Sequence, residues 1–159
     1  MRRGVIELIL LVVLGAGVGL AYNALSPRTL TVAPKQDRSY TGFRMVATDE
    51  VKLYMKEKPG TLLIDARDPE IYKLGHIPGA LNLPDDQFNS FYPKMKTTLE
   101  KAKLIIVYCD GGSCGTSEAL ARKLVAKGFP MGEIAIYGDG FPGWLKGKNP
   151  IIRDLGGSN

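Results

Sequence analysis

The amino-acid sequence predicts an α/β domain with a mostly parallel sheet of about five strands and helices on both faces, preceded by one transmembrane helix. The apolar runs 62–64 and 104–107 are typical of strands that are buried on both faces of a parallel sheet. Segments with helical spacing alternate with these strands, which favours parallel pairing. The transmembrane helix is expected because residues 5–22 are almost entirely apolar or small.

The amino-terminal segment 1–22 is interpreted as an uncleaved anchor. Eighteen helical residues reach about 27 Å, close to the thickness of a bilayer core. Arg2 and Arg3 should stay in the cytoplasm, so the protein is expected in the cell (inner) membrane as a single-pass protein with its domain outside the cytoplasm. The competing interpretation is a signal peptide cleaved after Gly19-Leu20-Ala21.

The rest of the chain divides into a linker, a domain and a tail. Residues 23–41 contain two prolines and little periodic pattern, which indicates a linker or strap. The domain is expected over 42–155, and 156–159 form a short tail. Within the domain, Thr48 is the expected N-cap of a helix that runs to about Lys58, and residues 85–103 are expected to be helical in parts. The expected strands are 43–46, 61–66, 80–83, 104–108 and 134–137, and the other expected helices are 116–127 and 141–146.

Composition excludes several classes of function. The net charge of +5 comes with scattered lysines and no interleaved aromatic residues, so nucleic-acid binding is not expected. Two cysteines and one histidine cannot build a disulfide-stapled scaffold or, unaided, a four-ligand zinc site. No metal or cofactor is expected.

The most informative stretch places Cys109 directly after the 104–108 strand, at the sheet edge where α/β proteins bind ligands. The loop that follows contains Gly111, Gly112 and Gly115, which tolerate positive φ and let backbone N–H groups turn inward. The start of the next helix adds partial positive charge, so both features stabilise a thiolate, the reactive form of cysteine. The alternative is a buried, inert cysteine.

A second stretch carries a family resemblance. Asp65-Ala66-Arg67 follows a buried strand, and Tyr72-Lys73-Leu74-Gly75-His76-Ile77-Pro78-Gly79-Ala80 follows shortly afterwards. This pattern, with Tyr108-Cys109, Tyr137-Gly138-Asp139-Gly140 and Trp144 in order behind it, resembles the rhodanese-like domain over about residues 46–152. The resemblance implies a sulfurtransferase in which Cys109 takes sulfane sulfur from a donor as a persulfide and passes it to a thiol or other nucleophile.

The resemblance also implies roles for other residues. The loop formed by Asp110, Gly111, Gly112, Ser113, Cys114 and Gly115 would bind the anion, with the amides of 110–114 directed at the sulfur. Asp65, Arg67 and His76 would be structural, with Arg67 paired to a carboxylate and His76 holding the turn.

This chain departs from the family pattern at two loop positions. Asp110 follows the cysteine, and Cys114 stands where arginine is frequent, so the loop has no cation to hold thiosulfate. Thiosulfate is therefore expected to be a poor donor. Gly115 stands where a tyrosine phosphatase would need arginine, and a phosphatase is excluded.

Cys114 keeps a second hypothesis open. It could act as a resolving thiol that forms a disulfide with Cys109, which an external thiol reductant would then reopen. A thiol reductant or a membrane protein is therefore an expected partner. A third hypothesis is a non-catalytic rhodanese-like binding module, because fold alone does not decide function.

Overall fold

The computed structural model describes residues 4, 6–7, 11–15, 42–112 and 115–154. The chain divides into two compact units, 1–37 and 38–159. Described residues of the first unit are helical, and in the described ranges no helix has both the length and the apolar character needed to cross a bilayer. The anchor expected over 5–22 thus gains no support from the structure, and most of it lies outside the described residues, as does the whole of the expected linker 23–41.

The second unit is built on a five-stranded sheet in the order β1-β5-β4-β2-β3. All four strand pairings are parallel, as continuous apolar runs and alternating helices predict. β4 lies between β2 and β5, with Tyr108 opposite both Asp65 and Tyr137. The strands are β1 (Arg44–Val46), β2 (Thr61–Asp65), β3 (Leu81–Asn82), β4 (Leu104–Tyr108) and β5 (Ile134–Tyr137).

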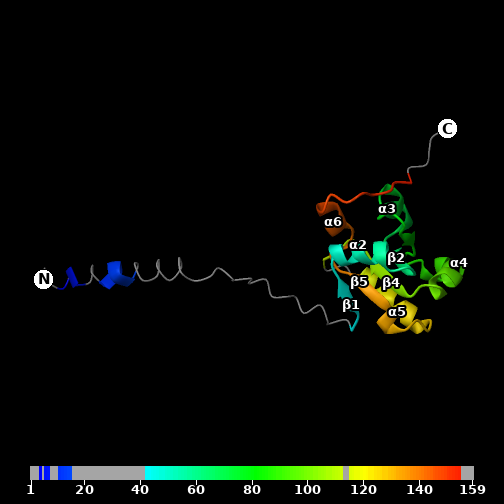
Figure 1. Cartoon of the computed structure of the whole chain (residues 1–159), viewed down its shortest axis with the longest axis horizontal. Helices are drawn as coiled ribbons and strands as arrows, with labels where there is room; N and C mark the ends of the chain where they lie inside the picture. Colours follow the sequence, from blue (N-terminus) through cyan, green and yellow to red (C-terminus); the bar gives the residue numbers. More distant parts are fainter. Residues whose placement is uncertain (1–3, 5, 8–10, 16–41, 113–114, 155–159) are drawn as a thin grey trace. The chain divides into compact units, whose positions relative to one another are not determined.

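Helices cover both faces of the sheet, as the sequence predicts. Residues Ile105 and Val107 of β4 join the core beneath α4 (Phe88–Glu100) and α5 (Thr116–Ala126). Ile106 and Tyr108, which point the other way, join the core shared with α2 (Thr48–Glu57) and α6 (Gly140–Lys146). Figure 1 shows the sheet between these groups of helices.

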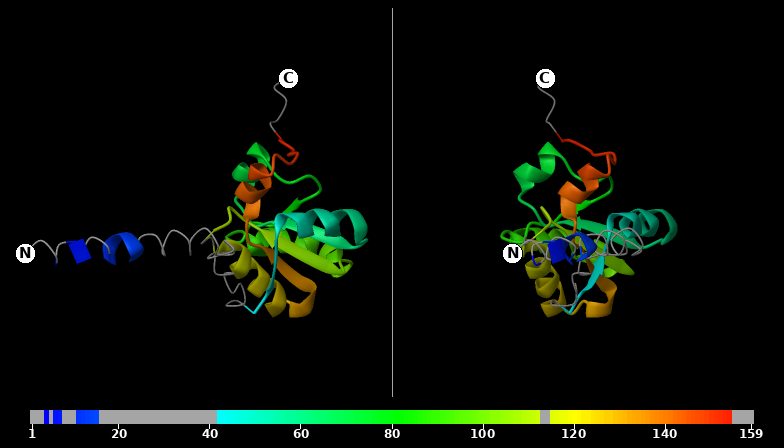
Figure 2. Two further views of the ribbon diagram at one scale, coloured as in Figure 1. Left: turned by 60° about the vertical axis from the view of Figure 1, so that its left-hand side comes forward. Right: turned by 90° about the vertical axis from the view of Figure 1, so that its left-hand side faces the viewer.

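Two elements were not expected from the sequence: α3 (Pro69–Leu74) and the short 3-10 turn Met131–Glu133. The N-cap of α3 is Asp68, whose carboxylate accepts a hydrogen bond from the Glu70 amide at 2.8 Å. Both views in Figure 2 show α3 and α6 at the same end of the domain, with the C-terminal segment passing them. That segment forms an antiparallel bridge between Ile152 and His76.

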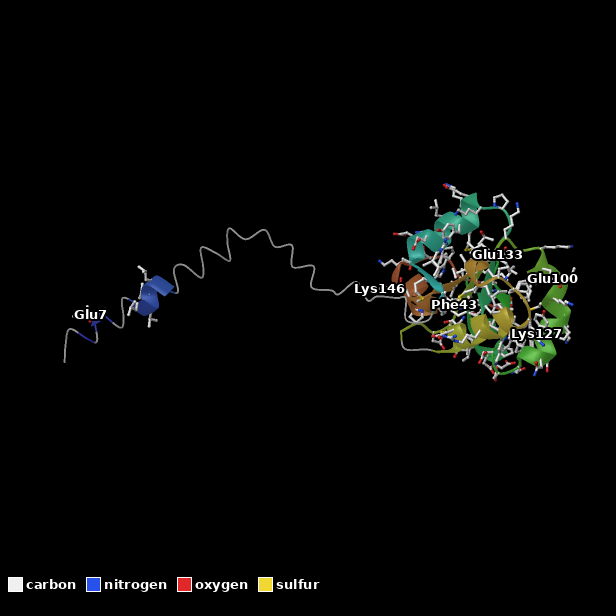
Figure 3. All side chains as sticks on the ribbon, turned by 90° about the horizontal axis from the view of Figure 1, so that it is seen from below. Glu7, Phe43, Glu100, Lys127, Glu133 and Lys146 are labelled. Atoms are coloured by element: carbon white, nitrogen blue, oxygen red, sulfur yellow. The ribbon has the colours of Figure 1, made fainter. Side chains whose placement is uncertain are left out.

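The assignment of Thr48 as an N-cap is wrong. Ala47 occupies the cap position, and its amide donates to Glu50 Oε2 at 2.9 Å. The Thr48 hydroxyl lies instead 2.7 Å from the hydroxyl of Tyr137, a residue on β5. The segment 85–103 is helical in part, as expected: α4 is one continuous helix that includes Pro93 and ends at Glu100, which is labelled in Figure 3.

Candidate active site

Cys109 follows β4, the central strand, at the carboxyl-terminal edge of the sheet. Its side chain belongs to the apolar core beneath α4 and α5, and the residue is 2% exposed. The Sγ atom lies 3.5 Å from Oγ of Ser117, and the thiol donates to that hydroxyl. The thiol is therefore covered, and the Ser117 hydroxyl at the start of α5 faces it.

The loop after Cys109 rests against the turn that follows β5. Gly111 and Gly140 have φ of 76° and 58°. A Cβ on Gly111 would overlap the Asp139 carbonyl, and one on Gly140 would overlap the Cys109 carbonyl and the Gly111 amide. The Phe141 amide also donates to the Cys109 carbonyl at 2.9 Å. Two glycines thus allow the backbones of the two loops to pack directly on each other.

The other two loop glycines, Gly112 and Gly115, have different backbone conformations. Gly112 has φ of 63° and open space around it, as expected for a loop glycine. Gly115, expected to contribute in the same way, has an ordinary φ of −77° and is the N-cap of α5. Because glycine has no side chain, Gly115 cannot form a side-chain hydrogen bond to the first backbone amides of α5. Ser113 and Cys114 lie outside the described residues.

The start of α5 lies next to the sulfur. Ser117 is buried at 4% exposure and follows the loop by one helical step. A helix start carries partial positive charge, and a hydroxyl can turn to donate to a thiolate. The sequence prediction included the helix start but missed Ser117. The available signal was its place in the sequence, as the second residue of the helix that follows the loop.

Arg67 is buried beside the site and pairs with the carboxylate of Asp65. Its Nε donates to Oδ1 at 2.9 Å, and its Nη2 donates to Oδ2 at 2.6 Å and to the Gly75 carbonyl at 2.8 Å. Burial acts to lower the pKa of Arg67, but the hydrogen bond and charge of Asp65 outweigh it and raise that pKa. The guanidinium therefore remains charged.

The same guanidinium also reaches the loop. Nη1 lies 3.7 Å from Oδ1 of Asp110, the residue after the cysteine. The Phe141 ring lies 4.1 Å from the guanidinium carbon. Arg67 thus links β2, the Cys109 loop and the start of α6, a set of contacts that the motif alone does not indicate.

His76 takes part in a different group of contacts. Its ring stacks on Tyr72 with centroids 3.8 Å apart, and Nδ1 donates to the Tyr72 carbonyl at 3.0 Å. Nδ1 also lies 4.0 Å from Asp154, in the C-terminal segment that bridges to His76. These contacts hold α3 and the chain end together, and the described partners of His76 do not include Cys109.

Comparison with known families decides the relationship. The family model described as "Rhodanese-like domain" matches residues 47–147. The chain belongs to the rhodanese-like domain family. Two tRNA uridine(34) hydroxylases resemble it: that of Photorhabdus laumondii is 37% identical over 60 residues (36% of this chain, 17% of that protein), and that of Cronobacter sakazakii is 35% identical over 71 residues (43% and 20%). The chain spans about a fifth of the length of the curated relatives it matches.

Solved structures agree with this rhodanese-like assignment. A Bacillus halodurans protein superposes with a TM-score of 0.60 at 26% identity, covering 70% of this chain and 78% of that one. The thiosulfate sulfurtransferase of Pseudomonas aeruginosa has a TM-score of 0.50 at 18% identity, covering 72% and 21%, and shares the fold. Relatives of this rhodanese-like domain thus include enzymes.

Proposed function

We propose that this rhodanese-like protein is a sulfurtransferase that carries sulfane sulfur as a persulfide on Cys109. One observation carries the proposal: the Cys109 sulfur lies at the end of the central strand, 3.5 Å from the Ser117 hydroxyl at the start of a helix. The hydroxyl and the helix start both stabilise negative charge on that sulfur. The family assignment supports the same chemistry.

The reaction has two displacement steps. The Cys109 thiolate attacks the outer sulfur of a donor R–S–SH, a new S–S bond forms, and R–S⁻ leaves with the electron pair of the broken bond. An acceptor thiolate then attacks the outer sulfur of the Cys109 persulfide and regenerates the Cys109 thiolate. Both steps exchange one S–S bond for another, so neither needs an external oxidant, a metal or a cofactor.

Access to the sulfur is part of the proposal. Cys109 is 2% exposed, so the side chains or backbone that cover Sγ must move for donor and acceptor to reach it. An inert cysteine would fail this requirement and would resist small alkylating reagents in the folded chain.

Intact mass spectrometry of the full chain tests the proposal. After incubation with an alkyl hydropersulfide, we expect a gain of about 32 Da, the mass of one sulfur atom, that is absent in Cys109→Ser and retained in Cys114→Ser. A loss of about 2 Da that requires both cysteines would replace the proposal with thiol–disulfide chemistry. An unchanged mass with hydropersulfide, polysulfide and thiosulfate would overturn it in favour of a binding module.

We also propose that residues 5–22 tether the protein to the inner membrane, with the domain outside the cytoplasm. The support is the apolar sequence after Arg2 and Arg3, whose charges favour the cytoplasmic side. Membrane fractions extracted with alkaline carbonate should retain the full chain, and external protease should digest its domain in spheroplasts. Recovery of the intact chain in the supernatant would contradict the tether.

A further inference from the structure

The segment from the end of α6 to the last described residues combines exposed aliphatic side chains with positive charge. Leu145 and Ile152 are large apolar residues, yet they are 45% and 42% exposed. Residues 145–153 contain no acidic residue. Their cations are Lys146, Lys148 and Arg153, all of them exposed. Segment 145–153 therefore presents apolar and cationic groups to solvent together.

The positive charge of this segment is not neutralised by the domain. Among the described residues, no carboxylate lies within ion-pairing distance of any of its three cations. The acidic side chains of adjoining elements have other neighbours: Asp154 lies 4.0 Å from Nδ1 of His76, and Glu70 of α3 pairs with Lys73 at 2.8 Å. The cations are thus available to an external anionic partner.

The backbone of segment 145–153 is fixed by contacts to the domain. Trp144 Nε1 donates to the Pro150 carbonyl at 2.7 Å, and the side-chain amide of Asn149 donates to the Trp144 carbonyl at 2.9 Å. Lys148 has a φ of 52° and is the only non-glycine residue with positive φ in the described part of the chain. Glycine is the usual residue at this position after a helix and would carry less strain. The position therefore keeps a positive charge although the charge brings backbone strain.

A third exposed aliphatic residue extends the apolar surface. Leu74, at the end of α3, is 59% exposed. The residue after it, Gly75, lies against the C-terminal segment, because a Cβ placed on it would be 3.4 Å from Cδ1 of Ile151. Figure 2 shows α3 and α6 at the same end of the domain. Leu74 and segment 145–153 thus belong to one end of the domain.

We propose that this end of the domain, formed by Leu74 and segment 145–153, docks on the surface of an anionic phospholipid membrane. Interfacial binding draws on apolar side chains that enter the headgroup region and on cations that face anionic lipid, and this surface offers both. A soluble anion would satisfy the cations but would leave Leu74, Leu145 and Ile152 in water. The inference concerns the folded domain and depends neither on the proposed tether nor on the proposed sulfur chemistry.

Trp144, the only tryptophan of the chain, reports the contact because it directly precedes Leu145. The full chain is mixed with vesicles that contain a lipid with a nitroxide-labelled headgroup, which quenches tryptophan fluorescence only at short range. We expect strong quenching on equimolar phosphatidylcholine and phosphatidylglycerol, and little on phosphatidylcholine alone. High salt should reverse the quenching on the mixed vesicles, because it screens the attraction.

Substitutions separate the two contributions to docking. The triple variant Lys146→Gln, Lys148→Gln, Arg153→Gln should abolish quenching on the mixed vesicles, because each cation strengthens binding by about fivefold and the three together by about 100-fold. The double variant Leu145→Ser, Ile152→Ser should reduce the quenching but keep its dependence on salt.

The matched control removes the same charge from the other face of the sheet. It replaces three exposed lysines in and directly after α4, as Lys94→Gln, Lys96→Gln and Lys101→Gln. Figure 3 shows Lys146 and Glu100, the last residue of α4, on opposite sides of the domain. The control variant should be quenched as strongly as the wild-type chain.

Several results would overturn the inference. Equal quenching on both kinds of vesicle, or quenching on neither, would show that this surface does not recognise anionic lipid. An equal loss in the control variant would show that net charge acts rather than this surface. A lipid-free dimer that Leu145→Ser dissociates would assign the surface to a second copy of the chain. Carbonate extraction and hydropersulfide loading report the tether and the sulfur chemistry separately, and thermal melting confirms that each variant is folded.

Discussion

The guanidinium of Arg67 and the carboxylate of Asp65 form a bidentate ion pair in which the side chains are 4% and 0% exposed. Asp65 also accepts a hydrogen bond from the Arg67 backbone amide at 3.0 Å. Each of these two residues at the end of β2 therefore fixes the position of the other. Asn82 extends the arrangement by donating to the backbone carbonyls of both residues. This pair fixes the edge of β2 next to which the Cys109 loop lies.

Removing one partner of this pair should cost far more stability than removing an exposed pair. Asp65→Asn leaves the buried Arg67 charge uncompensated, and we expect the free energy of unfolding to fall by about 3–5 kcal/mol, measured by urea denaturation. Glu70→Gln breaks the exposed pair with Lys73 and should lower the free energy of unfolding far less, because solvent screens that pair. Similar losses for the two variants would show that the buried pair is not a major contributor.

The Ser117 hydroxyl should matter for reactivity more than for folding. Ser117→Ala removes the oxygen 3.5 Å from the Cys109 sulfur, and persulfide formation should slow by about tenfold because the thiolate loses a hydrogen-bond donor. Stopped-flow alkylation of Cys109 at several pH values measures the same loss directly.

The control for that substitution is Ser90→Ala, which makes the same chemical change at an exposed position of α4. It should leave the rate of persulfide formation unchanged. If Ser117→Ala alkylates as fast as the wild-type chain over the whole pH range, the hydroxyl has no part in stabilising the thiolate.

Replacing a loop glycine with alanine should have a large effect at two positions and a small effect at a third. Gly111→Ala and Gly140→Ala push a methyl group into the backbone of the opposite loop, so both should lower the melting temperature and abolish persulfide formation. Gly112→Ala meets nothing within 4 Å and carries only the cost of its φ of 63°, about 1 kcal/mol. Equal effects of all three variants would mean that the close packing of the two loops is unimportant.

Alkaline pH should destabilise the fold through buried tyrosines. Burial raises the pKa of Tyr108, and the negative charge of Asp65 raises it further; burial also raises the pKa of Tyr72 and Tyr137. A tyrosine whose pKa is raised on folding contributes stability that is complete below its unfolded pKa of about 10 and is lost as pH rises above it. Urea midpoints measured from pH 8 to 11 should fall at the upper end.

Tyr108→Phe removes the tyrosine that we expect to contribute most to the loss of stability at alkaline pH. It should cost about 1 kcal/mol at neutral pH, because the Ile77 amide loses its acceptor at 3.2 Å, but its stability should fall less steeply above about pH 10. Tyr92→Phe on α4 is the matched control and should keep the wild-type slope. The same alkaline slope in Tyr108→Phe as in the wild-type chain would contradict the role of Tyr108.

Local patterns in the sequence determined the elements and the family. Runs of apolar residues predicted all five strands to within one residue at each end, because burial on both faces of a parallel sheet favours continuous aliphatic residues. The same runs placed Cys109 at the carboxyl-terminal edge, since a residue that follows a parallel strand must lie there. The motif around Arg67 identified the rhodanese-like domain, and it indicated a carboxylate partner for that arginine.

Only the tertiary structure decided which distant residues meet. Thr48 has the chemistry of an N-cap, yet its hydroxyl lies against Tyr137 because β1 and β5 are neighbours. Arg67 reaches Asp110 because β2 and β4 are neighbours, and no spacing along the chain reports that order. Side-chain partners across strands depend on sheet order and register, which arise only when the whole core packs.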